Sequence, residues 1–226
     1  MTLQLALNLP VRVDFSAESF VTGEANAAAV AALERWRDWP GAVMALAGPT
    51  GAGKSHLAAI WAEQVHAQIA TAAGLEASLS SLPAGRCLVV EDIDSDLPET
   101  ALFHAFNRVA ERSIPALLLV ARKPPVLWPA TLPDLVSRLR ALPYVELHEP
   151  DDELLTRLVL KQIQDRGAPI RPGVVEYLLP RMERSVSAVR NLVDRMDKLA
   201  LVRQTPITRS VARAALDAMT EDGVCE

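Results

Sequence analysis

Residues 45–57 read Ala45-Leu46-Ala47-Gly48-Pro49-Thr50-Gly51-Ala52-Gly53-Lys54-Ser55-His56-Leu57. Within this stretch, residues 48–55 follow the pattern G-x-x-x-x-G-K-S, in which glycines let successive backbone N–H groups converge on phosphate oxygens. The lysine adds a cation, and the serine hydroxyl is a ligand for Mg²⁺. Apolar residues before the loop predict a buried strand. The apolar residues after the loop have helical spacing, which predicts a helix whose positive end faces the phosphates. The sequence therefore predicts that residues 48–56 bind the phosphates of a nucleotide.

A second apolar run, which begins at Cys87, ends in the acids Glu91 and Asp92. A buried parallel strand has this character where it emerges at the nucleotide edge of a sheet. Carboxylates at this edge hold Mg²⁺ through water and polarise an attacking water. We predict this role for Glu91 and Asp92, with Ser55 as a further metal ligand, and leave open which acid serves the metal.

Strand and helix patterns alternate along the first 150 residues. Strands are predicted at 43–47, 67–72, 87–94, 115–121 and 144–147, and helices at 24–39, 57–65, 75–82, 102–112 and 133–140. The alternation implies an α/β fold with a doubly wound parallel sheet and helices on both faces. Beyond Pro150 only helical patterns follow, so we expect an α/β base at residues 16–150 and a small helical domain at residues 151–226.

Composition limits the classes of function. Of the 226 residues, 50% are hydrophobic and 23% are charged, so we expect a packed core. A net charge of −5 argues against a surface built mainly for duplex DNA, and 4% aromatic residues are too few for rows of base-stacking platforms. The spacing of the two cysteines and four histidines suggests no metal or disulfide framework. We expect a cytoplasmic protein without a membrane span.

Residues 1–15 have two interpretations. Apolar and polar side chains alternate here, so the segment is either an edge strand or frayed terminus packed on its own domain, or a linear motif. In the second case Gln4 would hydrogen-bond to another protein, and Leu5, Leu7 and Leu9 would fill an apolar pocket on it. Periodicity alone does not choose between them.

The order of these features resembles the AAA+ ATPases, and within them the DnaA-related branch. Phe20-Val21-Thr22-Gly23 resembles the family's segment on the nucleobase side, and Arg122-Lys123-Pro124-Pro125 resembles its Pro-Pro loop. Residues 135–139 (L-V-S-R-L) resemble its arginine-finger box, and residues 187–192 (S-A-V-R-N-L) its lid arginine motif. The chain most closely resembles the Hda-like regulatory inactivators of DnaA. The resemblance implies an AAA+ fold with a helical lid that binds ADP or ATP with Mg²⁺.

The resemblance gives roles to two arginines. Arg138 shares its helix with inward-facing leucines, so we expect its guanidinium to project outward to a neighbouring protomer's phosphate as an arginine finger. Arg140 is the alternative residue for this role. Arg190 is expected to reach the chain's own nucleotide from the lid, with Phe20 and Val21 on the other side. For both arginines the alternative is a surface ion pair.

The resemblance also favours the linear-motif interpretation of the N-terminus. Residues 4–9 match the Q-L-x-L-type peptide by which these inactivators bind the DNA polymerase sliding clamp. The implied protein docks on the clamp, meets DNA only through it, and presents Arg138 to ATP-bound DnaA at the nucleoid. That action would promote hydrolysis on DnaA and restrain re-initiation. A homodimer is compatible with this function.

Departures from the family pattern bear on the enzymatic activity. The acids read Glu91-Asp92 where Asp-Glu is usual, and the third buried strand ends in Val120-Ala121 where a polar sensor is usual. We therefore expect weak or no hydrolysis in the chain's own pocket. Two alternatives remain: a stand-alone AAA+ ATPase, helicase-loader-like or initiator-like, that acts as a homo-oligomer, and a nucleotide-stabilised interaction module without a catalytic contribution.

Overall fold

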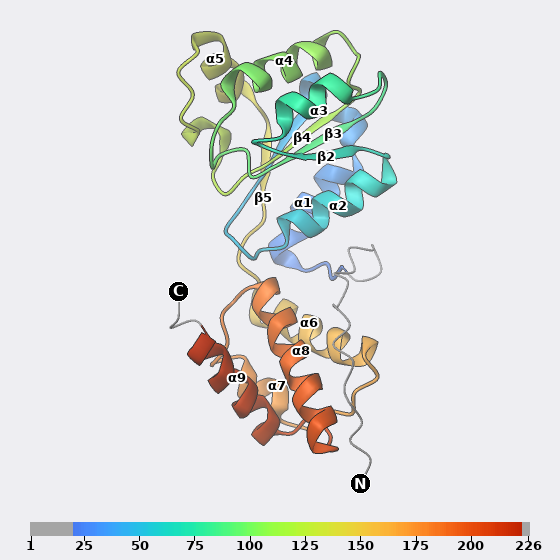
Figure 1. Ribbon diagram of the computed structural model, residues 1–226, viewed down its shortest axis with the longest axis vertical. Coiled ribbons are helices and arrows are strands. Elements are labelled where there is room, and N and C mark those ends of the chain that lie inside the picture. The colour runs from blue at the N-terminus through green and yellow to red at the C-terminus, as the bar shows by residue number, and fades with distance from the viewer. Residues whose placement is uncertain (1–19, 223–226) are drawn as a thin grey trace.

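A computed structural model describes residues 20–222 of the chain, which form an α/β part and a helical part (Figure 1). Within these residues the sheet consists of β1 (Val43–Ala47), β2 (Gln68–Thr71), β3 (Leu88–Glu91), β4 (Leu117–Val120) and β5 (Tyr144–Glu146). The strands lie in the order β2-β3-β4-β1-β5, and every neighbouring pair is parallel. The loops after β1, β3 and β4 therefore meet at one edge of the sheet.

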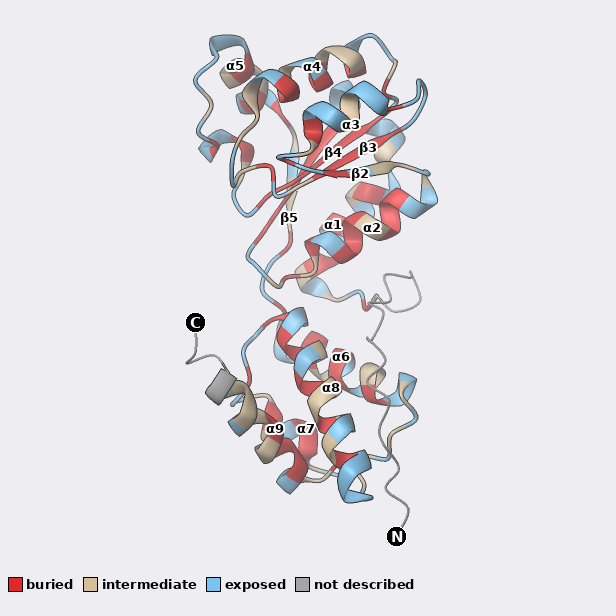
Figure 2. Cartoon of the chain, viewed as in Figure 1, coloured by how far each residue is buried: buried red, intermediate tan, exposed pale blue. Residues whose placement is uncertain are grey.

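Helices cover both faces of this sheet. On one face lie α1 (Glu24–Glu34) and α2 (Lys54–Gln64), and on the other lie α3 (Leu75–Ser81), α4 (Glu99–Ala110) and α5 (Pro133–Ala141) (Figure 1). Alternate residues of each strand supply the two cores, so Leu119 packs on the side of α4 while Leu118 packs on the side of α2. All five residues of β1 are buried, which explains their continuous apolar sequence (Figure 2).

The helical part follows β5 and has its own apolar core. It consists of α6 (Asp152–Asp165), α7 (Val174–Leu178), α8 (Val186–Arg203) and α9 (Arg209–Asp222). α6 begins where the Asp151 carboxylate accepts a hydrogen bond of 2.7 Å from the Leu154 N–H. Val21, from the segment before α1, packs into the core of these helices, so the chain joins the two parts at two places.

These elements confirm the predicted α/β fold, a parallel sheet with flanking helices and a helical C-terminal part, but they correct several boundaries: α2 and α4 each begin three residues before the predicted start, and α1 ends five residues before the predicted end. α1 ends at Glu34, and a short 3₁₀ turn, η2 (Trp36–Asp38), replaces the predicted continuation to residue 39. The Trp39 indole N–H donates to the Ala32 carbonyl at 2.8 Å, and its ring stacks on Trp61 with centroids 5.2 Å apart. The tryptophan therefore folds back on the sheet face instead of extending the helix.

The length and hydropathy of the helices decide whether any of them could span a membrane. Among residues 20–222, no helix is both long enough and apolar enough to cross a bilayer.

Candidate nucleotide site

The loop between β1 and α2 contains the predicted phosphate-binding residues. Gly51 (φ +78°) and Gly53 (φ +100°) adopt left-handed backbone conformations that L side chains rarely take. α2 begins at Lys54, directly after this loop, so the positive end of the helix faces the loop's concave side. The sequence needs glycine at these two positions to make the turn from strand to helix.

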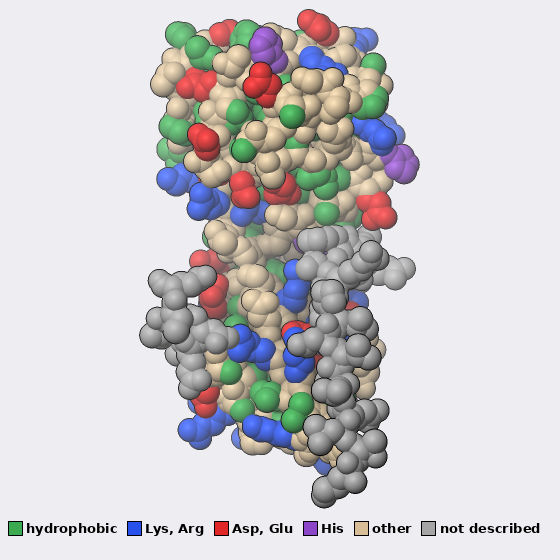
Figure 3. Space-filling model, in the orientation of Figure 1, with side chains coloured by type: hydrophobic (Ala, Val, Ile, Leu, Met, Phe, Trp, Pro, Cys, Tyr) green, Lys and Arg blue, Asp and Glu red, His purple; other side chains and the backbone are tan. Residues whose placement is uncertain are grey.

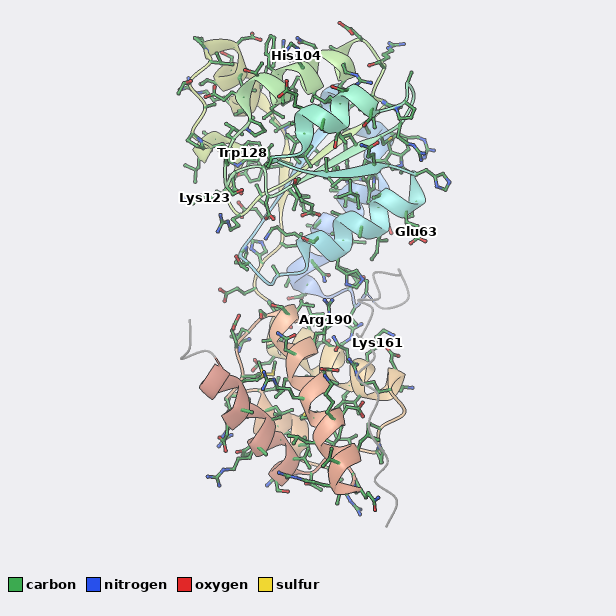
Figure 4. All side chains as sticks on the ribbon, in the orientation of Figure 1. Glu63, His104, Lys123, Trp128, Lys161 and Arg190 are labelled. Carbon is green, nitrogen blue, oxygen red and sulfur yellow. The ribbon has the colours of Figure 1, made fainter. Side chains whose placement is uncertain are left out.

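A pocket of about 470 Å³ lies at this edge of the sheet. Its lining comes from the loop, from the segments after β3 and β4, and from the start of α8: Thr50, Gly51, Gly53, Lys54, Ser55, His56, Asp92, Ser95, Arg122, Val186, Ser187 and Arg190. Figure 4 shows Arg190 where α8 meets the α/β part, and Figure 3 shows acidic and basic side chains along the lower rim of that part. The strand order and the packing of the helical part (α6–α9), called the lid from here on, thus gather residues that lie up to 140 positions apart.

Lys54 is held inside the loop. Only 8% of the residue is exposed, and its Nζ donates hydrogen bonds of 2.8 Å to the carbonyls of Gly48 and Pro49. Burial lowers the pKa of Lys54, the carboxylates of Asp92, Asp94 and Glu91 oppose that shift, and the charge of Arg122 adds to it. The ammonium is therefore a poorly solvated cation, which a phosphate oxygen would stabilise.

The two acids after β3 occupy different positions. Glu91 Oε2 accepts a hydrogen bond of 3.0 Å from the Ser55 hydroxyl. Burial raises the pKa of Glu91 and the charge of Asp92 adds to this, while the Ser55 hydrogen bond and the charge of Lys54 oppose it. Asp92 has a left-handed backbone (φ +52°) and lines the pocket. Glu91 is thus the acid beside the serine, and Asp92 is the acid that faces the pocket.

The lid contacts the phosphate loop directly. The Val186 N–H donates to the Gly51 carbonyl at 2.8 Å. A Cβ on Gly51 would lie 2.7 Å from the Ser185 Cβ and 2.8 Å from the Ser187 Oγ, so only glycine fits against this turn. Ser185 also caps α8, because its hydroxyl accepts a hydrogen bond of 3.0 Å from the Ala188 N–H. The start of α8 and the loop therefore form one packed unit.

Phe20 and Val21, the first two described residues, lie beside this pocket and outside its lining. The Phe20 ring contacts His56 edge-on, with centroids 5.3 Å apart. The Val21 carbonyl accepts a hydrogen bond of 2.9 Å from the Asn26 side chain, and Val21 itself is buried among the lid helices. In this structure the two residues join base to lid. The predicted partner-binding residues Gln4, Leu5, Leu7 and Leu9 lie outside the described residues.

Arg138 does not project outward as expected. Its Nε lies 3.0 Å from Asp134 Oδ2, and its Nη1 donates to Asn107 Oδ1 at 2.9 Å. The guanidinium carbon lies 4.8 Å from the centroid of the Phe103 ring, and one third of the side chain (33%) is exposed. The arginine therefore rests on α4, outside its own chain's pocket, while Arg140 is exposed on the same helix.

The predicted site residues did not include Arg122, which lines the pocket, or three residues that support it, Asp94, Ser185 and Ser187. Asp94 binds the backbone at the end of β4, and Ser185 with Ser187 packs on the loop. A third acid in the Glu91–Asp94 run was a visible signal for Asp94. Ser185 had no signal and Ser187 appeared only as part of the lid arginine motif, because their contact with Gly51 joins residues more than 130 positions apart.

Comparisons with known proteins support the fold. No family model matches the chain. An uncharacterized protein of Haemophilus influenzae is 26% identical over an alignment of 174 residues, which covers 71% of this chain and 75% of that protein. Among solved structures, domain III of the replication initiation protein DnaA from Thermotoga maritima superposes with a TM-score of 0.76 at 18% identity, covering 93% of this chain and 98% of that one.

Two further structures are similar. A variant of RuvB from Thermotoga maritima has a TM-score of 0.71 at 20% identity, covering 91% of this chain and 72% of that one. AMPPCP-bound DnaA from Aquifex aeolicus has a TM-score of 0.66 at 18% identity, covering 84% of this chain and 66% of that one. At these identities the likeness establishes the fold. The chain has the fold of DnaA domain III and of RuvB.

Proposed function

We propose that this chain binds ADP or ATP with Mg²⁺ between its phosphate loop and its lid. The observation that carries this proposal is the convergence of Lys54, Asp92, Arg122 and Arg190, from separate segments, on one pocket. Three cations and one acid suit a polyphosphate with its metal. The DnaA structure that holds AMPPCP has the same fold, which favours an adenine nucleotide.

We further propose that the chain regulates replication initiation by acting on DnaA. Arg138 lies on α5 and does not line the pocket of its own chain, which supports a role toward another protein's nucleotide once its contacts with Asp134 and Asn107 open. Beside α5, the 3₁₀ turn η4 (Pro125–Leu127) exposes 61% of Val126 and 63% of Leu127, an apolar surface suited to a protein partner. Residues 4–9 would attach the protein to the sliding clamp, and DNA would be met through the clamp.

The end of β4 supports weak hydrolysis in the chain's own pocket. Val120 and Ala121 are 1% and 0% exposed, and the Ala121 N–H is bonded to the Leu46 carbonyl. Apolar side chains at this position cannot orient an attacking water by hydrogen bonds. The bound nucleotide would then hold base and lid together while the chemistry occurs on DnaA.

The proposal is tested with DnaA loaded with ATP, the sliding clamp on DNA, and this protein. Arg138→Ala is expected to lose most of the stimulated hydrolysis, because an arginine finger contributes about 10³–10⁵-fold. Arg140→Ala, at the alternative residue on α5, should keep the stimulation; if it loses the stimulation and Arg138→Ala does not, Arg140 is the finger. Replacing Gln4 and Leu7 with alanine should abolish clamp binding, and with it the stimulation that the clamp-bound protein gives in the same assay. Full stimulation by Arg138→Ala, with unchanged nucleotide binding, would rule out the finger.

A second prediction concerns the role of Glu91 in binding Mg²⁺. A raised carboxyl pKa means that the ionised form is less stable in the folded protein than in the unfolded chain, so this charge costs stability at neutral pH. The cost disappears as the pH falls through the raised pKa. Glu91→Gln should therefore not lower the melting temperature of the nucleotide-free protein, yet should abolish the gain in ATP affinity that Mg²⁺ gives over EDTA.

Asp92→Asn is the comparison for this measurement. It removes the other acid of the pair. Asp92 lines the pocket, whereas Glu91 is the acid that accepts the hydrogen bond from Ser55. If Asp92→Asn loses the Mg²⁺ effect and Glu91→Gln keeps it, the metal assignment is reversed.

A stand-alone ATPase is the second candidate function. The arrangement of Lys54, Ser55 and Glu91 favours it, because these three residue types support turnover in other phosphate-loop enzymes. Steady hydrolysis by the purified protein without DnaA or clamp, abolished by Lys54→Ala, would support this function over the regulatory one.

A further inference from the structure

Arg122 follows β4 and lines the pocket. We propose that Arg122 binds the terminal phosphate of a nucleoside triphosphate, so that this chain distinguishes ATP from ADP. The inference rests on the proposed nucleotide binding and adds a residue that gives the site its specificity.

The backbone at Arg122 is fixed on both sides. The Asp94 carboxylate accepts hydrogen bonds of 3.1 Å from the N–H of Arg122 and from that of Lys123. The Trp128 indole N–H donates to the Lys123 carbonyl at 2.8 Å, and Figure 4 shows these two residues close together at this edge. The base of the Arg122 side chain is therefore held in place before any ligand arrives.

Strand register places Arg122 beside the start of the phosphate loop. Val120 on β4 pairs with Leu46 on β1, and the Ala121 N–H donates to the Leu46 carbonyl at 3.0 Å. Two residues beyond this pair the chains reach Arg122 and Gly48, so the arginine and the first glycine of the loop leave the sheet side by side.

The charges identify the phosphate. Lys54 and Arg122 line the same pocket, so both cations act on the same space. In a loop of this type the backbone N–H groups hold the inner phosphates and the lysine reaches the outer ones. Asp92, the acid of the pocket lining, is available to the metal that accompanies these outer phosphates. A cation next to Lys54 and beyond the loop's start therefore faces the outermost phosphate and not the inner pair.

The experiment compares dissociation constants for ATP and ADP, each with Mg²⁺, in the full-length protein and its variants. Arg122→Ala is expected to weaken the binding of ATP about 10- to 100-fold, as for loss of one charge-assisted contact, and the binding of ADP by less than about threefold. Lys123→Ala is the matched control, because it removes an exposed cation from the next position of the same loop; it should change neither constant.

Two outcomes separate this inference from the proposed function. If the unaltered protein binds both nucleotides and Arg122→Ala keeps its ratio of ATP to ADP affinity, the role of Arg122 is overturned and nucleotide binding stands. If the unaltered protein binds neither nucleotide, both the proposed nucleotide binding and the proposed role of Arg122 are wrong. Partial recovery of the ratio in Arg122→Lys would support a phosphate contact over a purely structural effect, since the lysine keeps the charge.

Discussion

Replacing Lys54 with methionine is expected to weaken the binding of ATP and of ADP by about 100-fold or more, since two charge-assisted contacts contribute about 3–6 kcal/mol together. The buried ammonium has two carbonyl contacts to exchange for phosphate oxygens. The measurement is the rise in melting temperature that saturating nucleotide produces, which should vanish in the variant because a ligand stabilises only the folded state that binds it.

The nucleotide-free protein should respond differently. A lowered pKa means that the folded state holds the Lys54 proton less tightly than the unfolded chain, so the buried charge costs stability at neutral pH. Lys54→Met, which keeps the length of the side chain, should therefore melt near the temperature of the unaltered protein without ligand. Lys161→Ala, on the surface of α6, is the control (Figure 4). An undiminished nucleotide effect in Lys54→Met would contradict the site.

Gly51→Ala is expected to separate the lid from the phosphate loop. The new Cβ would approach Ser185 and Ser187 within 3.0 Å, closer than side chains pack, so either the loop or the start of α8 must move. That movement breaks the bond between the Val186 N–H and the Gly51 carbonyl. We expect a lower free energy of unfolding, by about 2–4 kcal/mol from backbone strain and overlap together, and a loss of nucleotide affinity of at least about tenfold.

Gly85→Ala is the matched control for the strain of the left-handed backbone conformation. Gly85 has φ +79° against +78° for Gly51, but no atom of residues 20–222 outside its immediate neighbours lies within 4 Å of the position that a Cβ would take. Its substitution should cost only the left-handed strain, about 1–2 kcal/mol. The difference between the two variants then measures the contact between loop and lid. Equal free energies of unfolding, together with unchanged nucleotide binding by Gly51→Ala, would show that this contact is unimportant.

The sequence predicted those parts of the fold that depend on local chemistry. The loop at residues 48–55 and strand β1 were predictable because glycine spacing and a continuous apolar run allow few other structures. The end of α1 was not, because it depends on Trp39 folding back onto Trp61, which lies 22 residues further along the chain. Propensity in that segment favours helix, and the tertiary contact overrides it.

The site divides in the same way. Residues within one motif were placed by the sequence, whereas contacts between motifs needed the strand order and the lid packing. Asp94 reaches Arg122 only because β3 lies next to β4, and the Arg138 side chain of α5 packs against α4 only because Asn107 and Phe103 face α5. The direction of the Arg138 side chain therefore could not follow from the pattern of its own helix.

Calorimetric titration of the full-length protein with ATP and with ADP, both with Mg²⁺, tests most directly whether a nucleotide binds between the loop and the lid. We predict saturable binding of one nucleotide per chain. Absence of saturable binding by either nucleotide at millimolar concentration would contradict the account.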